Sequence, residues 1–202
     1  MINLLKGQFI RYLANRQSSS VIFEEDEFIV KAEVTSDVLF DIMDKKETIL
    51  QPIGEGSATY NNPEGKTITF IDYEDFINQL PDSLSKNIKR CDFLAYDSDC
   101  TSFILNELSQ SGSRANKLND ARKQLHKTAF LLCGVAEIKE FIYHHKNKQC
   151  IFSNKQQLIS TPNNIADAFS LICNYLPQPI HHNFQPIAKL GFELIETAII
   201  NV

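Results

Sequence analysis

The chain has 202 residues, of which 43% are hydrophobic, and it carries a formal net charge of −5 at pH 7. This length and apolar content suit one packed domain. The acidic balance argues against a protein that coats nucleic acid with its whole surface, but it permits a local basic patch. No apolar run reaches the ~18 to 20 residues that span a bilayer, so we expect no membrane partner and a cytoplasmic location.

The five cysteines are odd in number, widely spaced and without a C-x-x-C pair. This pattern predicts neither a disulfide framework nor a zinc knuckle, and it favours small core residues in a reducing compartment. Cys150 could ligate zinc together with the His144-His145 and His181-His182 pairs. These histidines, however, lack the H-x-x-x-H spacing typical of such sites.

The first half of the chain predicts a helix and strand extension. Helices are predicted from apolar spacing and capping residues at 1–16, 35–44 and 72–80. Strands are predicted from apolar or alternating runs at 21–23, 28–34, 48–53 and 58–71. Residues 61–65, which read N-N-P-E-G, predict a hairpin turn within the last of these strand segments.

The most informative region begins after residue 88. Cys91–Tyr96 and Ser102–Leu108 are apolar, aromatic-rich runs separated by a polar turn, which predicts a hairpin in the middle of a sheet. Alternation along each strand places Asp92 on one face of the first and Glu107 on one face of the second. The two carboxylates could therefore converge.

A helix over residues 116–132 follows this hairpin, with a buried apolar stripe at the 3.6-residue period. Lys123 and Lys127 lie opposite the stripe, whereas Lys117 and Gln124 share one of its edges. The remaining predicted elements are a helix at 135–145, a strand at 150–153, a helix at 163–175 and an apolar strand or helix at 192–202.

These elements predict an α/β fold with a central mixed sheet flanked by helices. We expect a single domain over residues 1–202, in which residues 1–80 form the N-terminal extension and residues 88–155 form the core.

Two acidic residues on neighbouring strands are typical of a divalent-cation site for phosphodiester hydrolysis. Mg²⁺ and Mn²⁺ prefer carboxylate and carbonyl oxygens, neutralise phosphate and lower the pKa of a bound water. Asp92, Glu107 and the carbonyl of Leu108 are the predicted metal ligands. Alternatively, Asp92 is paired with Lys89 or Arg90, and Glu107 is hydrogen-bonded at a strand end.

The arrangement resembles the PD-(D/E)xK nuclease-like superfamily, also called restriction-endonuclease-like. The core of that superfamily is strand, strand, helix, strand, with an acidic residue on the first strand and an E-x-K tripeptide on the second. The matching residues are Asp92 in K-R-C-D-F-L and Glu107-Leu108-Ser109 in I-L-N-E-L-S, so that Ser109 stands where the family has lysine. The helix segment A-R-K-Q-L-H resembles the one that supplies a glutamine or a basic residue in many members, which corresponds to Gln124.

The resemblance implies a restriction-endonuclease-like core and an Mg²⁺- or Mn²⁺-dependent nuclease. Asp92, Glu107, Lys117 and Gln124 would form its catalytic site, with Lys117 on the following helix replacing the missing lysine. Lys123 and Lys127 would contact the nucleic-acid backbone, and this contact should weaken with salt. Alternatively, Lys123, Lys127 and His126 form an ordinary solvated helix face.

Two other hypotheses stay open. Ser109 cannot supply the fixed positive charge of a lysine, which favours a catalytically inactive nuclease-like module for binding or for a larger assembly. The apolar segment 192–202 would instead suit a self-associating structural protein, in which it is buried in a homodimer.

Overall fold

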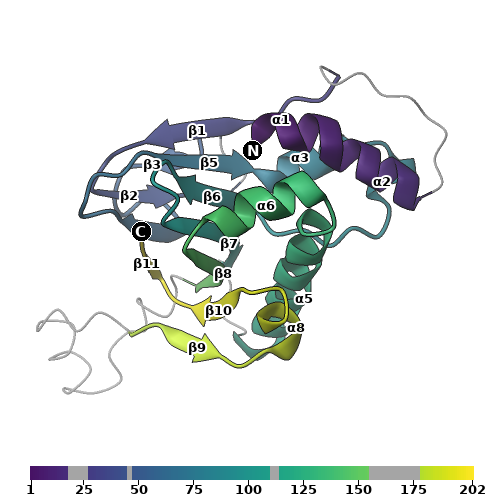
Figure 1. Cartoon of the computed structure of the whole chain (residues 1–202). Helices are drawn as coiled ribbons and strands as arrows, with labels where there is room; N and C mark the ends of the chain where they lie inside the picture. The colour runs from purple at the N-terminus through teal and green to yellow at the C-terminus, as the bar shows by residue number, and fades with distance from the viewer. Residues whose placement is uncertain (18–26, 45–46, 110–113, 155–177) are drawn as a thin grey trace, which may run out of the picture.

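The chain builds two sheets that lie against each other, as a computed structural model of residues 1–17, 27–44, 47–109, 114–154 and 178–202 shows (Figure 1). The larger sheet is mixed and has seven strands in the order β1 (Ala32–Thr35), β5 (Ile68–Asp72), β6 (Phe93–Asp97), β7 (Ser102–Ser109), β8 (Asn147–Asn154), β10 (Glu193–Glu196) and β9 (Ile180–His182). The smaller sheet has the order β11 (Ile199–Asn201), β4 (Ala58–Asn61), β2 (Leu39–Ile42) and β3 (Leu50–Gln51). The fold is therefore α/β with a central mixed sheet, as predicted.

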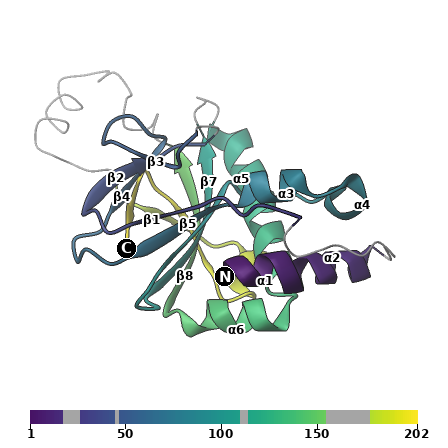
Figure 2. The same ribbon diagram turned by 90° about the horizontal axis from the view of Figure 1, so that it is seen from above.

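The helices cover the face of the larger sheet that is turned away from the smaller sheet (Figure 2). They are α1 (Ile2–Leu4), a π-helical stretch (Leu5–Phe9), α2 (Ile10–Arg16), α3 (Tyr73–Gln79), α4 (Asp82–Ser85), α5 (Arg114–Leu132), α6 (Ala136–His144) and α8 (Gln185–Ala188). Among the described residues, no helix is both long enough and apolar enough to cross a membrane.

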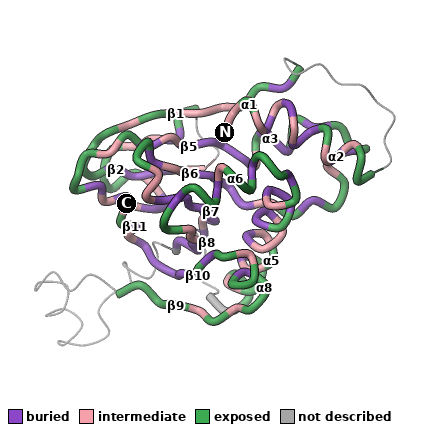
Figure 3. Tube along the Cα trace, viewed as in Figure 1, coloured by how far each residue is buried: buried purple, intermediate pink, exposed green. Residues whose placement is uncertain are grey.

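Strand alternation divides the core into two apolar clusters. Leu94 and Leu105 face the helices, where Leu125 of α5 packs in the same cluster. Phe93 and Ile104, one position away on the same strands, face the smaller sheet instead. Both faces of β6 and β7 are therefore covered, and Figure 3 shows these strands as buried.

The connections within the larger sheet set up the site. Strands β5, β6 and β7 form an antiparallel meander, and β8 then pairs parallel with β7. A parallel pair needs a long crossover connection, and α5 and α6 lie between β7 and β8 in the chain. The predicted hairpin and both predicted helices of this region are confirmed.

The predicted helix at 35–44 is wrong, because β2 occupies Leu39–Ile42. β2 pairs antiparallel with β4, and this pairing sends Phe40 and Ile42 into the core. Buried Asp41 accepts hydrogen bonds from the N–H groups of Gly54 and Gly56, both at 2.9 Å, which ties the strand to the loop before β4.

Other boundaries differ from the prediction for reasons of pairing. The turn at 61–65 is present, but it joins β4 and β5, which enter different sheets. The apolar segment 192–202 divides into β10, which pairs with β8, and β11, which pairs with β4. The strand predicted at 28–34 begins only at Ala32. The strand predicted at 21–23 and the helix predicted at 163–175 lie outside the described residues.

Candidate metal centre

Asp92 and Glu107 meet at one end of the β6–β7 pair. Phe93 lies opposite Asn106 in the register, so the next positions outward are Asp92 and Glu107. The Leu108 N–H donates a hydrogen bond of 2.6 Å to Oδ2 of Asp92, which fixes that carboxylate against β7. The structure therefore brings together the two acidic residues singled out in the sequence. The carbonyl of Leu108 as a metal ligand stays a prediction.

Helix α3 brings a third carboxylate to the same place. Asp72 caps the helix by accepting a hydrogen bond of 2.9 Å from the N–H of Asp75, as predicted. The carbonyl of Asp92 accepts hydrogen bonds from the N–H groups of Tyr73 (2.9 Å) and Glu74 (3.1 Å). These bonds hold the first turn of α3 against the strand that carries Asp92, and Glu74 lies in that first turn.

Asp44, just after β2, completes an acidic cluster that we call the carboxylate cluster: Asp44, Glu74, Asp92 and Glu107. Carboxylate oxygens of the first three all lie within 4.8 Å of one another. Asp44 and Glu74 were not among the residues predicted from the sequence. Asp44 is far from Asp92 along the chain, and Glu74 has the pattern of an ordinary acidic residue in a helix first turn.

Glu107 has an unfavourable environment in the absence of a cation. Its side chain is only 8% exposed, and its Oε2 has no hydrogen-bond partner among the residues that the structure describes. Burial, and then the charges of Asp92 and Glu74, raise the pKa of Glu107 to about 10, while a hydrogen bond from Gln124 acts in the opposite direction. Without a cation, burial and these neighbouring charges therefore favour the protonated form of Glu107.

Arg90 is a basic residue that contacts the cluster. Its Nε lies 3.8 Å from Oε1 of Glu74, and its guanidinium also donates to Oδ1 of Asn78. The carbonyl of Arg90 accepts a hydrogen bond of 3.2 Å from Nε2 of Gln124, the α5 residue that also reaches Glu107. Gln124 therefore lies at the site, as its position on the helix edge predicted.

The other predicted site residues lie farther out or are uncharged. Lys117 is exposed on α5 and forms no ion pair with any acidic residue in the described part of the chain. Lys123 pairs with Asp120 at 3.5 Å, and Lys127 lies beside the ring of Phe130. Ser109 is buried, and its hydroxyl has no partner among the described residues.

Three of the four histidines considered for zinc have other partners. Nδ1 of His181 lies 2.6 Å from Glu193, and Nε2 of His182 lies 3.1 Å from Glu196. Nδ1 of His145 is 2.9 Å from the carbonyl of Phe141. Within the described ranges, the only group of three or more His, Cys, Asp or Glu side chains close enough to share an ion is Asp44, Glu74 and Asp92.

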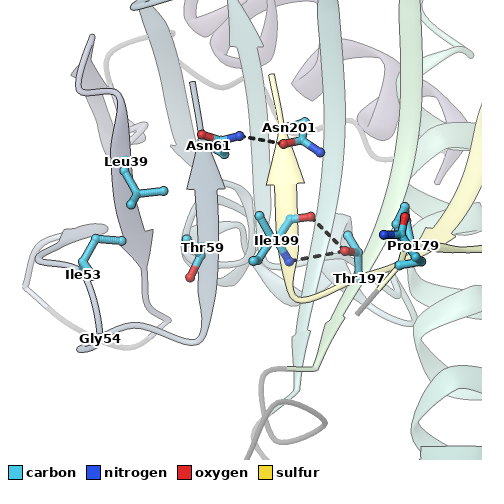
Figure 4. Close-up of a pocket in the computed structure, with 10 residues that line it drawn as sticks. Leu39, Ile53, Gly54, Thr59, Asn61, Pro179, Thr197, Ile199 and Asn201 are labelled. Carbon is cyan, nitrogen blue, oxygen red and sulfur yellow. Dashed lines mark hydrogen bonds between the residues drawn. The ribbon is translucent and has the colours of Figure 1, made fainter. Parts of the chain in front are cut away.

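A pocket of about 540 Å³ lies elsewhere, on the outer side of the smaller sheet (Figure 4). Leu39, Ile53 and Ile199 give it an apolar wall, and the side-chain amide of Asn61 donates to that of Asn201 at 2.9 Å. None of its lining residues in the described part of the chain is ionisable. The pocket therefore supplies no acid, base or carboxylate ligand, unlike the carboxylate cluster.

No protein-family model, curated protein or solved structure matches this chain. The chemistry of the carboxylate cluster is therefore the basis for a functional conclusion.

Proposed function

We propose that the protein is a divalent-cation-dependent phosphodiester hydrolase of the PD-(D/E)xK nuclease-like kind. The observation that carries the proposal is Glu107, a buried carboxyl with an unpartnered oxygen beside three further carboxylates. Gathering four acidic groups, of which Asp92 and Glu107 are buried, is costly unless a cation compensates them. The donor set, which is all oxygen, suits Mg²⁺ or Mn²⁺.

The arrangement of the strands supports a restriction-endonuclease-like core. The β5–β6–β7 meander, the α5 crossover and the parallel strand β8 follow the order of that core. Asp92 immediately precedes β6, Glu107 lies near the end of β7, and Gln124 projects from the following helix. These are the three positions at which the sequence resembles the superfamily.

Each residue of the site has a proposed role. Asp92 and Glu107 would hold the ion, with Asp44, Glu74 and the Leu108 carbonyl as further oxygen ligands. Bound Mg²⁺ or Mn²⁺ would supply charge neutralisation for the phosphate and acidify a water molecule. Gln124 orients Glu107 through its hydrogen bond.

The family has a lysine at the position of Ser109, and two basic residues are candidates to replace its charge. Lys117 keeps the role predicted from the sequence, on the edge of α5. Arg90 is a second candidate, because it contacts Glu74 and its backbone carbonyl holds Gln124. Lys123 and Lys127 of the same helix would contact the nucleic-acid backbone.

Cleavage of DNA and of RNA in Mn²⁺ tests the proposal, with wild-type protein compared with Glu107→Ala. We expect metal-dependent cleavage in the wild type and a loss of at least about 100-fold in the variant, which removes a proposed ligand. Glu140→Gln on the exposed side of α6 is the matched control and should cleave as the wild type does. Equal cleavage in the wild type and the Ala variant, or none in either, would contradict the proposal.

A second candidate function is a non-catalytic nuclease-like module that serves binding or assembly. The buried hydroxyl of Ser109 at the lysine position, together with the exposed Lys117, favours it. Such a module would bind its partner equally well in chelator and in Mn²⁺, and it would cleave neither nucleic acid.

A further inference from the structure

A row of basic and aromatic side chains runs along the outer side of α5, and we call it the α5 strip. Its members are Arg122, His126, Lys127 and Phe130 of α5, Phe184 before α8, and Arg16 of α2. The Arg122 guanidinium lies 5.9 Å from the ring of Phe184, and the His126 ring lies 6.3 Å from Phe184 and 6.4 Å from Phe130. Cations and rings therefore alternate along the helix.

Positive charge is concentrated on this helix in an acidic protein. α5 contains five basic residues and one acidic residue, a formal charge of +4, so the rest of the chain carries −9. The acidic residue, Asp120, pairs with Lys123 and leaves the other cations of the helix unneutralised by it. Such segregation suits a polyanionic partner.

Phe130 is the exposed aromatic centre of the strip. Its side chain is 42% exposed, although large apolar side chains are usually buried. The Arg16 guanidinium lies 5.4 Å and the Lys127 ammonium 5.8 Å from the ring centroid. Neither cation has a carboxylate partner among the residues that the structure describes.

We infer that the α5 strip binds single-stranded nucleic acid, with an unpaired base stacked on Phe130 and the flanking phosphates at Arg16 and Lys127. Exposed rings bordered by cations are what sequence-tolerant binding of single strands requires. A paired base in a duplex is already stacked on both sides, so Phe130 selects an unpaired strand.

This inference deepens the proposed function. It rests on that function for the path of the nucleic acid from the α5 strip towards the carboxylate cluster. Gln124, which contacts Glu107, lies six residues before Phe130 on the same helix. Six residues correspond to about 9 Å along the helix axis. The same six residues turn the helix by about 600°, so Phe130 projects about 120° away from Gln124, and Lys127 lies between them around the helix. A strand stacked on Phe130 would therefore pass over Lys127 to reach the carboxylate cluster, and the charge of α5 would explain its binding to an acidic protein.

Tyr143 on α6 provides a matched control within the same chain. It is 45% exposed, and Lys139 and Lys148 lie 5.5 and 5.7 Å from its ring. Tyr143 differs from Phe130 in having a hydroxyl, which donates a hydrogen bond of 3.0 Å to the carbonyl of Leu190. α6 carries two acidic residues and one lysine, so it lacks the net positive charge of α5.

Fluorescence anisotropy of a labelled 15-nucleotide oligo-dT in EDTA measures binding without cleavage. We expect saturable binding that Phe130→Leu weakens by at least about fivefold, because the variant keeps apolar volume but loses the stacking face. Tyr143→Leu should bind as the wild type does, and Lys127→Gln should lower the slope of log K against log salt by about 0.7. A duplex of the same length should bind more weakly than the single strand.

No binding by the wild type, or equal binding by Phe130→Leu, would overturn the inference. So would equal or tighter binding of the duplex, or displacement of the oligonucleotide by polyglutamate. Failure of the strip is distinguishable from failure of the hydrolase. Binding in EDTA that depends on Phe130, without cleavage in Mn²⁺, upholds the strip and rejects the hydrolase. Cleavage that is unaffected by Phe130→Leu upholds the hydrolase and rejects the strip.

Discussion

Replacing Glu107 by glutamine should remove a pH dependence of stability from the metal-free protein. In the folded protein, burial and the nearby charges of Asp92 and Glu74 keep the pKa of Glu107 far above that of an unfolded chain, which is about 4.3. Between these two values, the folded protein retains a proton that the unfolded chain releases. The contribution of Glu107 to stability is therefore greatest at acidic pH and is lost as the pH rises towards the folded pKa.

The size of this pH dependence follows from the single proton that Glu107 binds in the folded protein and releases on unfolding. One bound proton changes the free energy of unfolding by about 1.4 kcal/mol for each pH unit. Between pH 5.5 and pH 7.5, the wild type should therefore lose about 2 to 3 kcal/mol relative to Glu107→Gln. Both pH values lie above the unfolded pKa and below the raised folded pKa, so the full slope applies.

Urea denaturation in EDTA, followed by circular dichroism at several pH values, measures this difference. Glu140→Gln changes the formal charge equally at an exposed position of α6 and should keep the wild-type slope. Saturating Mn²⁺ should stabilise the wild type increasingly as the pH rises, because metal competes with the proton. Parallel pH dependences of wild type and Glu107→Gln in EDTA would refute the reasoning about the carboxylate cluster.

Three further changes test the packing that positions the site, each by urea denaturation at one pH. Leu105→Ala should cost about 2 to 5 kcal/mol, because Leu105 is fully buried against the helices; a loss below about 1 kcal/mol would contradict that packing. Asp72→Ala should cost about 1 kcal/mol and Asp72→Asn less, since asparagine keeps the acceptor for the Asp75 N–H; equal losses would exclude the cap as the cause. Tyr60→Phe should cost about 1 to 2 kcal/mol by removing the acceptor of a 3.1 Å bond from buried Asn106, and an unchanged midpoint would contradict it.

The central hairpin could be predicted because its information is local. Cys91–Tyr96 and Ser102–Leu108 are long apolar runs with a polar turn between them, and the structure forms β6 and β7 there. The Asp72 cap and the buried stripe of α5 are likewise local patterns. Convergence of Asp92 and Glu107 followed from the period of two along adjacent strands.

The missed features depend on contacts between distant parts of the chain. Residues 39–42 form a strand because they pair with β4 and bury Phe40 and Ile42, which outweighs the capping pattern at Thr35 and Ser36. Asp44 reaches the carboxylate cluster through that same pairing, and Glu74 reaches it through the hydrogen bond to the carbonyl of Asp92. No residue spacing in the sequence indicates that Asp44 and Glu74 lie near Asp92.

Calorimetric titration of the protein with Mn²⁺ tests most directly whether the carboxylate cluster is a metal centre. The wild type and Glu140→Gln should show the same saturable uptake, and Glu107→Gln and Asp92→Asn should each bind at least about tenfold more weakly. Absence of uptake in the wild type, or equal uptake in all four proteins, would contradict the assignment of a metal to Asp92 and Glu107.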